Sequence, residues 1–341
     1  MDNKKNQTAE TSENQIQEEQ IKALYPSKWK TIAGVTAATL FCALVAGLGV
    51  GSVFYKDTKK TSEASASLPA EKSFTDPFAF VKIEARSAVV WDIKNQKALY
   101  SKNSLEPLPL ASLTKIMTAI TAVDLVPHST VVTINKAALA SEGDTGLFAD
   151  EKWKLSDLID FSLIVSSNDG ASAIAAVVGA VSSGWEDPEI GRAEFIKKMD
   201  EKTKEVGLES TFFSNENGLD TDKDHSGGVG SALDMAHLFE YTLNHYPDIL
   251  EVTRYEKREI SSLSDISHEA ENTNTIIADI PGLIASKTGY TELSGGNLII
   301  AFDPALGRPI IVSVLGSSYE GRFSDTLALV NAATSYISQG R

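Results

Sequence analysis

The hydrophobic pattern separates an apolar N-terminal segment from a longer region of mixed patterns. Residues 31–55 (TIAGVTAATLFCALVAGLGVGSVFY) contain no charged residue. About 20 apolar residues are enough to cross a lipid bilayer as a helix. This segment therefore predicts one transmembrane helix. A buried core helix is the alternative, and the length of the segment and its lack of polar breaks argue against it.

The segments on either side of this apolar run are polar. Residues 1–30 are rich in Gln, Glu and Asn, a composition typical of disordered chain. Residues 56–73 are small and charged, as in a linker. The sequence Ala64–Ala66 resembles a signal-peptide cleavage site but lies far beyond the apolar run. We therefore expect an uncleaved anchor, with a cleaved signal peptide as the alternative, and a folded domain over residues 74–341.

The folded region begins and ends with patterns typical of strands. Residues 87–103 contain two β-rich runs on either side of a polar turn at Lys94–Lys97, which predicts a hairpin. Near the C-terminus a turn that contains Pro and Gly joins the last two of three further runs. The predicted C-terminal strands cover residues 282–291, 296–302 and 308–316.

Helical patterns occupy the region between these strands and close the chain. Apolar spacing makes residues 108–250 mainly helical, including 155–180 and 231–245. A final amphipathic helix is predicted over 323–338. Strands at both ends with helices between them predict an α+β domain. Its antiparallel sheet is built from both ends of the domain, beside a mainly helical lobe, with the site in the cleft between them.

Charge and composition exclude two kinds of site. The formal net charge is −15, whereas binding to phosphates needs a basic face, so we expect no nucleic-acid partner. The chain has one cysteine, Cys42, and its five histidines show no HxxxH or HxH spacing. We therefore expect no metal site.

Candidate chemistry appears first in the stretch LPLASLTKIMTAITAVDL, residues 108–125. Its apolar residues recur at helical spacing, yet Ser112 and Lys115 share one face of the first turn. A serine hydroxyl becomes a nucleophile when a neighbouring base removes its proton. A lysine can be that base when burial or nearby positive charge lowers its pKa. The alternative is a solvated helix start, because Ser and Lys are common on helix surfaces.

Two more short motifs follow in the chain. Ser166 and Asn168 form an SxN motif in VSSNDGA, where a predicted helix meets a loop. Lys287–Gly289 form a KTG motif on a predicted strand. SxxK and SxN also recur elsewhere in the chain and are weak singly, whereas KTG occurs once. The three motifs in this order are typical of serine acyl-transfer sites.

With these motifs the folded region resembles the D-alanyl-D-alanine carboxypeptidases, the low-molecular-weight penicillin-binding proteins of serine peptidase family S11. The stretches FSNENGLD (213–220) and GSALDMAHL (230–238) are similar to family segments, and residues 272–302 follow the family nearly residue for residue. The resemblance covers about residues 75–341. It implies the fold of penicillin-binding proteins and β-lactamases.

The resemblance implies a role for the residues of the first two motifs. Ser112 would be the acyl-forming nucleophile and Lys115 its general base. Ser166 would relay a proton towards the leaving amine, and Asn168 would hold the substrate amide. This chemistry requires no cofactor and no metal.

The KTG strand would bind the C-terminal end of the substrate. Lys287 and Thr288 would bind the terminal carboxylate, and Gly289 would let the strand approach the substrate closely. The backbone amides of Ser112 and Tyr290 would form the oxyanion hole. The charge of Lys287 would also lower the pKa of the general base.

Two of the departures of this sequence from the family pattern lie in or beside the motifs. Ser167 replaces the glycine of the usual SGN motif, and its added side chain is expected to narrow the cleft. Tyr290 follows KTG where histidine or another residue often stands. A class A β-lactamase shares SxxK and KTG, but here the middle motif is SSND and no convincing Glu-bearing loop follows it. A catalytically weak sensor of β-lactams or peptidoglycan is the other alternative.

The implied activity is removal of the terminal D-Ala from peptidoglycan stem peptides, with β-lactams as acylating inhibitors. Peptidoglycan lies outside the cytoplasm. We therefore expect a single-pass protein of the cell membrane, anchored through residues 31–55, with a cytoplasmic N-terminus and an extracytoplasmic catalytic domain.

Overall fold

The computed structural model describes residues 75–340. The predicted tail (1–30), transmembrane helix (31–55) and linker (56–73) lie outside the described residues. Within residues 75–340, no helix combines the length and the apolar composition that crossing a lipid bilayer requires.

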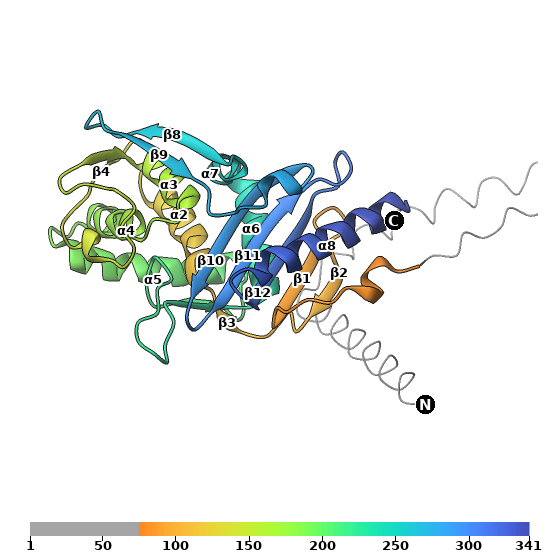
Figure 1. The fold of residues 1–341 in the computed structure, drawn as a ribbon. Helices are drawn as coiled ribbons and strands as arrows, with labels where there is room; N and C mark the ends of the chain where they lie inside the picture. The colour runs from red at the N-terminus through yellow and green to blue at the C-terminus, as the bar shows by residue number, and fades with distance from the viewer. Residues whose placement is uncertain (1–74, 341) are drawn as a thin grey trace, which may run out of the picture. The chain divides into compact units, whose positions relative to one another are not determined.

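A five-stranded antiparallel sheet forms the centre of the domain (Figure 1). The strand order is β10-β11-β12-β1-β2, so strands from the two ends of the domain pair with each other. Ser87 lies opposite Leu315 and Asp92 lies opposite Ile310. This pairing confirms that the sheet is built from both ends. Its strands are β1 (Ser87–Asp92), β2 (Lys97–Lys102), β10 (Leu283–Thr291), β11 (Gly295–Phe302) and β12 (Ile310–Ser317).

Helices cover both faces of this sheet. On one face, Leu298 and Ile300 of β11 share a core with Phe323 of α8 (Gly321–Ser338). On the other face lies α6 (Ala232–His245), seen behind the strands in Figure 1. Side chains of a strand alternate between the two faces, so strands covered on both sides are apolar along their whole length. This burial explains the clear sequence signal of β1, β11 and β12.

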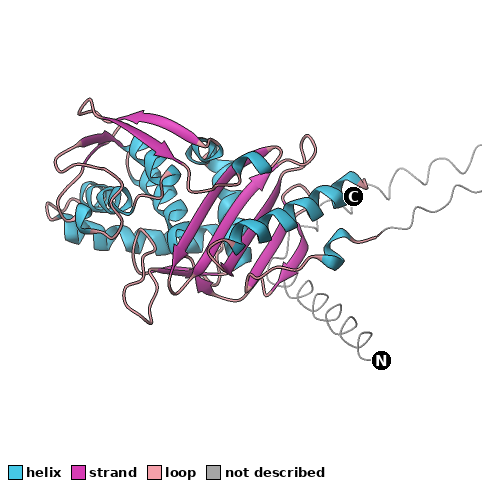
Figure 2. Cartoon of the chain, in the orientation of Figure 1, coloured by secondary structure: helices cyan, strands magenta, loops and turns pink. Residues whose placement is uncertain are grey.

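The helical lobe lies beside the edge strand β10 (Figure 2). It contains α2 (Thr114–Leu125), α3 (Leu155–Ile164), α4 (Asn168–Ser183) and α5 (Pro188–Val206), and the short α7 (Pro247–Glu251) packs near β10. The lobe and the sheet therefore meet along β10, the strand that carries the KTG motif.

The helical pattern over residues 155–180 belongs to two helices. α3 ends at Ile164 and α4 begins at Asn168. Between them Ser166 has a φ of 62°, in the left-handed region, which ends a right-handed helix. The break places the SxN motif where a helix meets a loop, as the sequence predicts.

Several short elements have no clear signal in the sequence. In the hairpin of β8 (Lys257–Ser261) and β9 (Ser267–Glu271), only His268 and Ala270 of β9 are buried. Two buried positions give too little hydrophobic alternation to predict a strand. The other short strands are β3 (Leu108–Pro109), β4 (Val131–Thr133), β5 (Lys152–Lys154), β6 (Phe212–Phe213) and β7 (Gly228–Gly230). The 3-10 helices are η1 (Pro77–Phe80), η2 (Ala111–Leu113), η3 (Ala138–Ala140), η4 (Val252–Arg254) and η5 (Ile277–Asp279).

The predicted hairpin and the C-terminal elements are confirmed. β10, β11, β12 and α8 begin and end within two residues of the predicted bounds. The domain is the α+β architecture that the sequence predicts.

Candidate active site

Ser112 lies in the 3-10 turn η2, directly before α2, and is partly exposed. The preceding residue, Ala111, has a φ of 48°, a left-handed conformation that costs about 1–3 kcal/mol for a residue with a side chain. Gly218 lies against this turn. A Cβ at Gly218 would lie 1.9 Å from the Ala111 carbonyl oxygen, so glycine allows the loop after β6 to support the strained turn.

Lys115 lies one turn further along and is 2% exposed. Its Nζ donates to Ser112 Oγ at 2.8 Å, to Asn168 Oδ1 at 2.6 Å and to the Asn217 carbonyl oxygen at 2.7 Å. When the Lys115 amine is neutral it keeps two hydrogens, which suffice for Asn168 Oδ1 and the Asn217 carbonyl oxygen. Its lone pair then remains for the proton of the Ser112 hydroxyl, which is the geometry of a general base.

Burial gives Lys115 the pKa that this role needs. Desolvation lowers the pKa of its amine from 10.5 to about 7, while the charge of Glu216 acts in the opposite direction. The sequence predicts that burial and nearby positive charge, including that of Lys287, lower this pKa. Burial of Lys115 is the principal cause.

Lys287 of β10 is the second buried amine of the site, also 2% exposed. Its Nζ donates to Ser166 Oγ at 2.9 Å and to the carbonyl oxygen of Thr288 at 2.8 Å. Burial lowers its pKa well below the usual value, and the charges of Lys115 and Arg322 lower it further. A bound carboxylate would favour the charged form of Lys287, because an opposite charge stabilises an ammonium.

Asn168 connects the second motif to the first. Its Oδ1 accepts from Lys115, and its Nδ2 donates to the Glu142 carbonyl oxygen at 2.6 Å. Both groups of the side-chain amide are therefore bound within the protein. The geometry gives Asn168 a role in orienting Lys115, and its contact with a substrate amide stays a prediction.

Ser167 does not narrow the cleft, contrary to the expectation from the sequence. It is fully buried, and its hydroxyl accepts from the Gly170 amide at 2.9 Å as the N-cap of α4. A second hydrogen bond joins this hydroxyl to Thr145 Oγ1 at 2.7 Å. The added side chain points into the helix start because an N-cap hydroxyl satisfies a free backbone amide there.

Gly289 brings β10 against the turn around Ser112. We call this the nucleophile turn, because Ser112 is the predicted nucleophile. A Cβ at this position would lie 3.0 Å from the Leu110 carbonyl oxygen and 3.2 Å from the Ser112 amide nitrogen. The glycine therefore permits a close approach to the protein's own turn. The close approach of this strand to a substrate stays a prediction.

The two residues beside Gly289 differ in exposure. Thr288 is 3% exposed, and its hydroxyl lies 2.5 Å from that of Thr273. Tyr290 is 48% exposed and packs edge-to-face on Tyr319. The side chain of Tyr290 thus lies at the rim of the site.

Two residues that hold the backbone around the site were not predicted from the sequence. Asn297 of β11 is fully buried, donates to the Pro109 carbonyl oxygen at 3.0 Å and accepts from the Gly316 amide at 2.8 Å. Arg322 of α8 donates to the Gly289 carbonyl oxygen at 3.0 Å. A polar Asn inside the apolar strand GNLIIAF was a usable signal, because buried polar groups need partners. Nothing in the local sequence pointed to Arg322.

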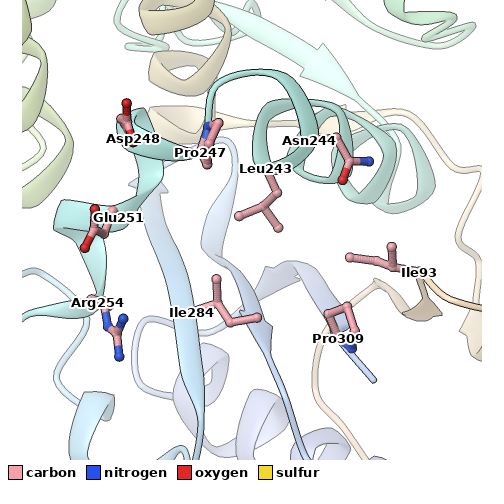
Figure 3. A pocket seen from close by; sticks show the side chains of 9 residues that line it. All are labelled: Ile93, Leu243, Asn244, Pro247, Asp248, Glu251, Arg254, Ile284 and Pro309. Atoms are coloured by element: carbon pink, nitrogen blue, oxygen red, sulfur yellow. The ribbon is translucent and has the colours of Figure 1, made fainter. Parts of the chain in front are cut away.

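A cavity of about 350 Å³ lies apart from these residues (Figure 3). Leu243, Ile284 and Pro309 line it, with Arg254 and Glu251 among its charged residues. None of the motif residues contributes to its wall. The candidate site is therefore marked by its chemistry rather than by this cavity.

The structure brings the three motifs into one site. Two serine hydroxyls each contact a buried lysine amine, and a glycine of the edge strand lies against the nucleophile turn. Together with the fold, this arrangement defines the class of serine acyl-transfer proteins that use lysine as the base. Residues 71–318 match the family Peptidase_S11, D-alanyl-D-alanine carboxypeptidase. The chain belongs to this family.

Individual relatives agree with this assignment. The chain is 34% identical over 214 residues to D-alanyl-D-alanine carboxypeptidase DacF of Bacillus subtilis, which covers 61% of this chain and 51% of DacF. It is 26% identical over 309 residues to DacC of Escherichia coli, covering 86% of this chain and 69% of DacC. The chain thus spans about half the length of DacF.

Solved structures share the fold. Penicillin-binding protein D2 of Listeria monocytogenes, in its cefotaxime-bound form, is 26% identical with a TM-score of 0.62, over 74% of this chain and 98% of that one. The Streptomyces K15 DD-transpeptidase has a TM-score of 0.66 at 21% identity, over 74% of this chain and 98% of that one. At that identity the second comparison speaks for the fold alone.

We predict that Gly289→Ala slows acylation of Ser112 by about tenfold or more, because the added methyl pushes β10 away from the nucleophile turn. The rate of labelling by a fluorescent penicillin, measured on the full chain, tests this. Leu306→Ala is the control, since the Leu306 side chain is fully exposed. Equal labelling rates for both variants would contradict the prediction.

The lowered pKa of Lys115 predicts the pH dependence of acylation. Below a pH of about 7 the amine becomes an ammonium and cannot accept the Ser112 proton. The second-order labelling rate should therefore fall about tenfold per pH unit well below that value and level off above it. A rate that keeps rising until pH 10 would mean that Lys115 retains its ordinary pKa.

Proposed function

We propose that this protein is a serine-type D-Ala-D-Ala carboxypeptidase that removes the terminal D-Ala from peptidoglycan stem peptides through an acyl-enzyme on Ser112. The observation that carries the proposal is the hydrogen bond between Lys115 Nζ and Ser112 Oγ, at 2.8 Å, with the amine buried and its pKa lowered to about 7. Membership of the family supports the same activity.

Acylation begins when Lys115 accepts the hydroxyl proton and Ser112 Oγ bonds to the carbonyl carbon of the terminal peptide bond. The backbone amides of Ser112 and Tyr290 are proposed to stabilise the negative oxygen that forms. The approach of Gly289 to the Ser112 amide supports this role, because it brings the Tyr290 strand beside the nucleophile.

The carbon–nitrogen bond then breaks and the terminal D-Ala leaves as an amine. Ser166 is proposed to relay the proton to this amine, since its hydroxyl is held 2.9 Å from Lys287 Nζ. Lys287 and Thr288 are proposed to bind the free carboxylate of the substrate. Asn168 is proposed to hold the substrate amide in addition to orienting the base.

Water then hydrolyses the acyl-enzyme and releases the shortened peptide. No protein group other than these is required to balance the reaction, and no metal or cofactor enters it. β-lactams are proposed to acylate the same serine, which is supported by the cefotaxime-bound and ampicillin-bound forms of the Listeria relative.

Glu216 lies between the second and third motifs, where a class A β-lactamase would need a glutamate to activate water. Its Oε1 accepts from Ser172 at 2.5 Å and its Oε2 accepts from Arg192 at 2.9 Å. Both oxygens of this fully buried carboxylate are thus hydrogen-bonded to the protein. These contacts favour the carboxypeptidase over the β-lactamase.

We also propose that residues 31–55 anchor the protein in the cell membrane, with the N-terminus in the cytoplasm and the catalytic domain outside. The uncharged apolar run supports this topology, and so does a substrate that lies outside the cytoplasm. In intact spheroplasts, an added protease should then degrade the catalytic domain of the full chain. A domain that stays protected until the membrane is lysed would contradict the proposed topology.

The full chain should form a covalent adduct with benzylpenicillin that maps to Ser112, and Ser112→Ala should form none. Intact mass measures the adduct, and release of D-Ala from a stem pentapeptide measures turnover. An adduct without D-Ala release would favour the sensor alternative. Rapid consumption of penicillin without an accumulating adduct would favour a β-lactamase.

A further inference from the structure

Glu216 is a fully buried carboxylate whose partners come from two helices. Ser172 of α4 donates to one oxygen and Arg192 of α5 donates to the other. A buried carboxylate is costly unless it is paired and hydrogen-bonded. Neither Arg192 nor Glu216 belongs to the three motifs, so the roles predicted for those motifs do not account for this ion pair.

The close packing of α4 and α5 brings Arg192 to this position. A Cβ at Gly179 of α4 would lie 1.9 Å from the carbonyl oxygen of Gly191 of α5. The helices can approach this closely because both contact residues are glycines. Arg192, the next residue on α5, then extends from the surface, where its side chain is 35% exposed, to the buried Glu216.

The backbone beside this ion pair holds the face of α2 that carries the general base. The Glu216 carbonyl oxygen accepts from Thr118 Oγ1 at 2.6 Å, and the Asn217 carbonyl oxygen accepts from Lys115 Nζ at 2.7 Å. Asn217 Nδ2 also donates to Ser172 Oγ at 3.3 Å. The side chain of Glu216 thus fixes the segment whose carbonyl orients the amine.

The ion pair also sets the charge near Lys115. α2 packs against α3, α4, α5 and α6, and β10 places Lys287 within electrostatic range of Lys115. Glu216 is the carboxylate whose charge raises the pKa of Lys115, against the stronger effect of burial. The other buried or partly buried carboxylates on these four helices are Asp157 and Asp160 on α3, Asp169 on α4, Glu194 and Asp200 on α5, and Asp234 and Glu240 on α6.

We propose that the Arg192–Glu216 ion pair is a positioning device for the general base: Glu216 fixes the Asn217 carbonyl that holds Lys115, and Arg192 neutralises the carboxylate that this support requires. The side-chain hydrogen bonds of this pair join the two residues to each other and to Ser172, and neither residue hydrogen-bonds to Ser112. The inference rests on the proposed function, because it assumes that Lys115 activates Ser112.

The two halves of the pair should shift the pH dependence of acylation in opposite directions. Arg192→Ala leaves the negative charge of Glu216 without its partner, which stabilises the ammonium form of Lys115. Glu216→Gln removes that negative charge and destabilises the ammonium. We expect the acid limb of the benzylpenicillin acylation rate to move up by about 0.5–1 pH unit in Arg192→Ala and down by a similar amount in Glu216→Gln.

Two further variants make the test specific to this ion pair. Arg192→Lys keeps the positive charge and should return the acid limb most of the way to the wild-type position. Lys198→Ala removes an exposed ion pair with Glu201 on the same helix and should leave the limb unmoved. If Glu216→Gln does not fold, the contrast between Arg192→Ala and Arg192→Lys decides the question alone.

Each outcome has one meaning. Opposite shifts, or an upward shift in Arg192→Ala that Arg192→Lys reverses, support the proposal. A uniform loss of rate with an unmoved limb, or shifts in the same direction, would overturn it and leave the pair a structural contact. A wild-type chain that benzylpenicillin acylates at no pH would overturn the proposed function and this inference together.

Discussion

The whole site depends on burying two lysine amines where the helical lobe meets the edge of the sheet. Water would solvate each amine far better than a protein interior does, so each must find acceptors inside. Lys115 finds the carbonyl of Asn217 and the side chains of Ser112 and Asn168, and Lys287 finds a carbonyl and a serine hydroxyl. The same burial that makes these residues costly converts an ordinary cation into a base near neutral pH.

Close backbone contacts hold the helical lobe and the sheet together at this junction. Residues with side chains at the contact positions would keep the backbones further apart. Gly218 and Gly289 each approach the turn around Ser112 from a different element, one from a loop and one from the edge strand. Asn297 joins the segment before that turn to the sheet. Ser112, the proposed nucleophile, is therefore held from both sides of the junction, which suits a reaction in which small displacements greatly lower the rate.

The sequence predicted the sheet and the motifs because both are local signals. Strands buried on two faces are apolar throughout. The spacing of Ser112 and Lys115 can be read from the sequence alone, without knowledge of the residues that surround them in the fold. The left-handed conformations of Ala111 and Ser166 were not predictable, since neither residue type favours them and distant contacts impose them. Arg322 and Arg192 were not predicted for a related reason. Each contacts a residue that is distant in sequence, Gly289 for Arg322 and Glu216 for Arg192. The hairpin of β8 and β9 has too few apolar positions to be recognised.

Ser167 shows what kind of variation a catalytic motif can absorb. Its hydroxyl is buried as the N-cap of α4, so the helix start determines which residues suit this position. At an N-cap, replacing serine by glycine changes stability by only a few tenths of a kcal/mol. Exchange between the two residues therefore acts on the start of α4 and not on the hydroxyls and amines of the candidate site. A sequence pattern that requires glycine at this position therefore describes the start of a helix and not a residue that contacts Ser112.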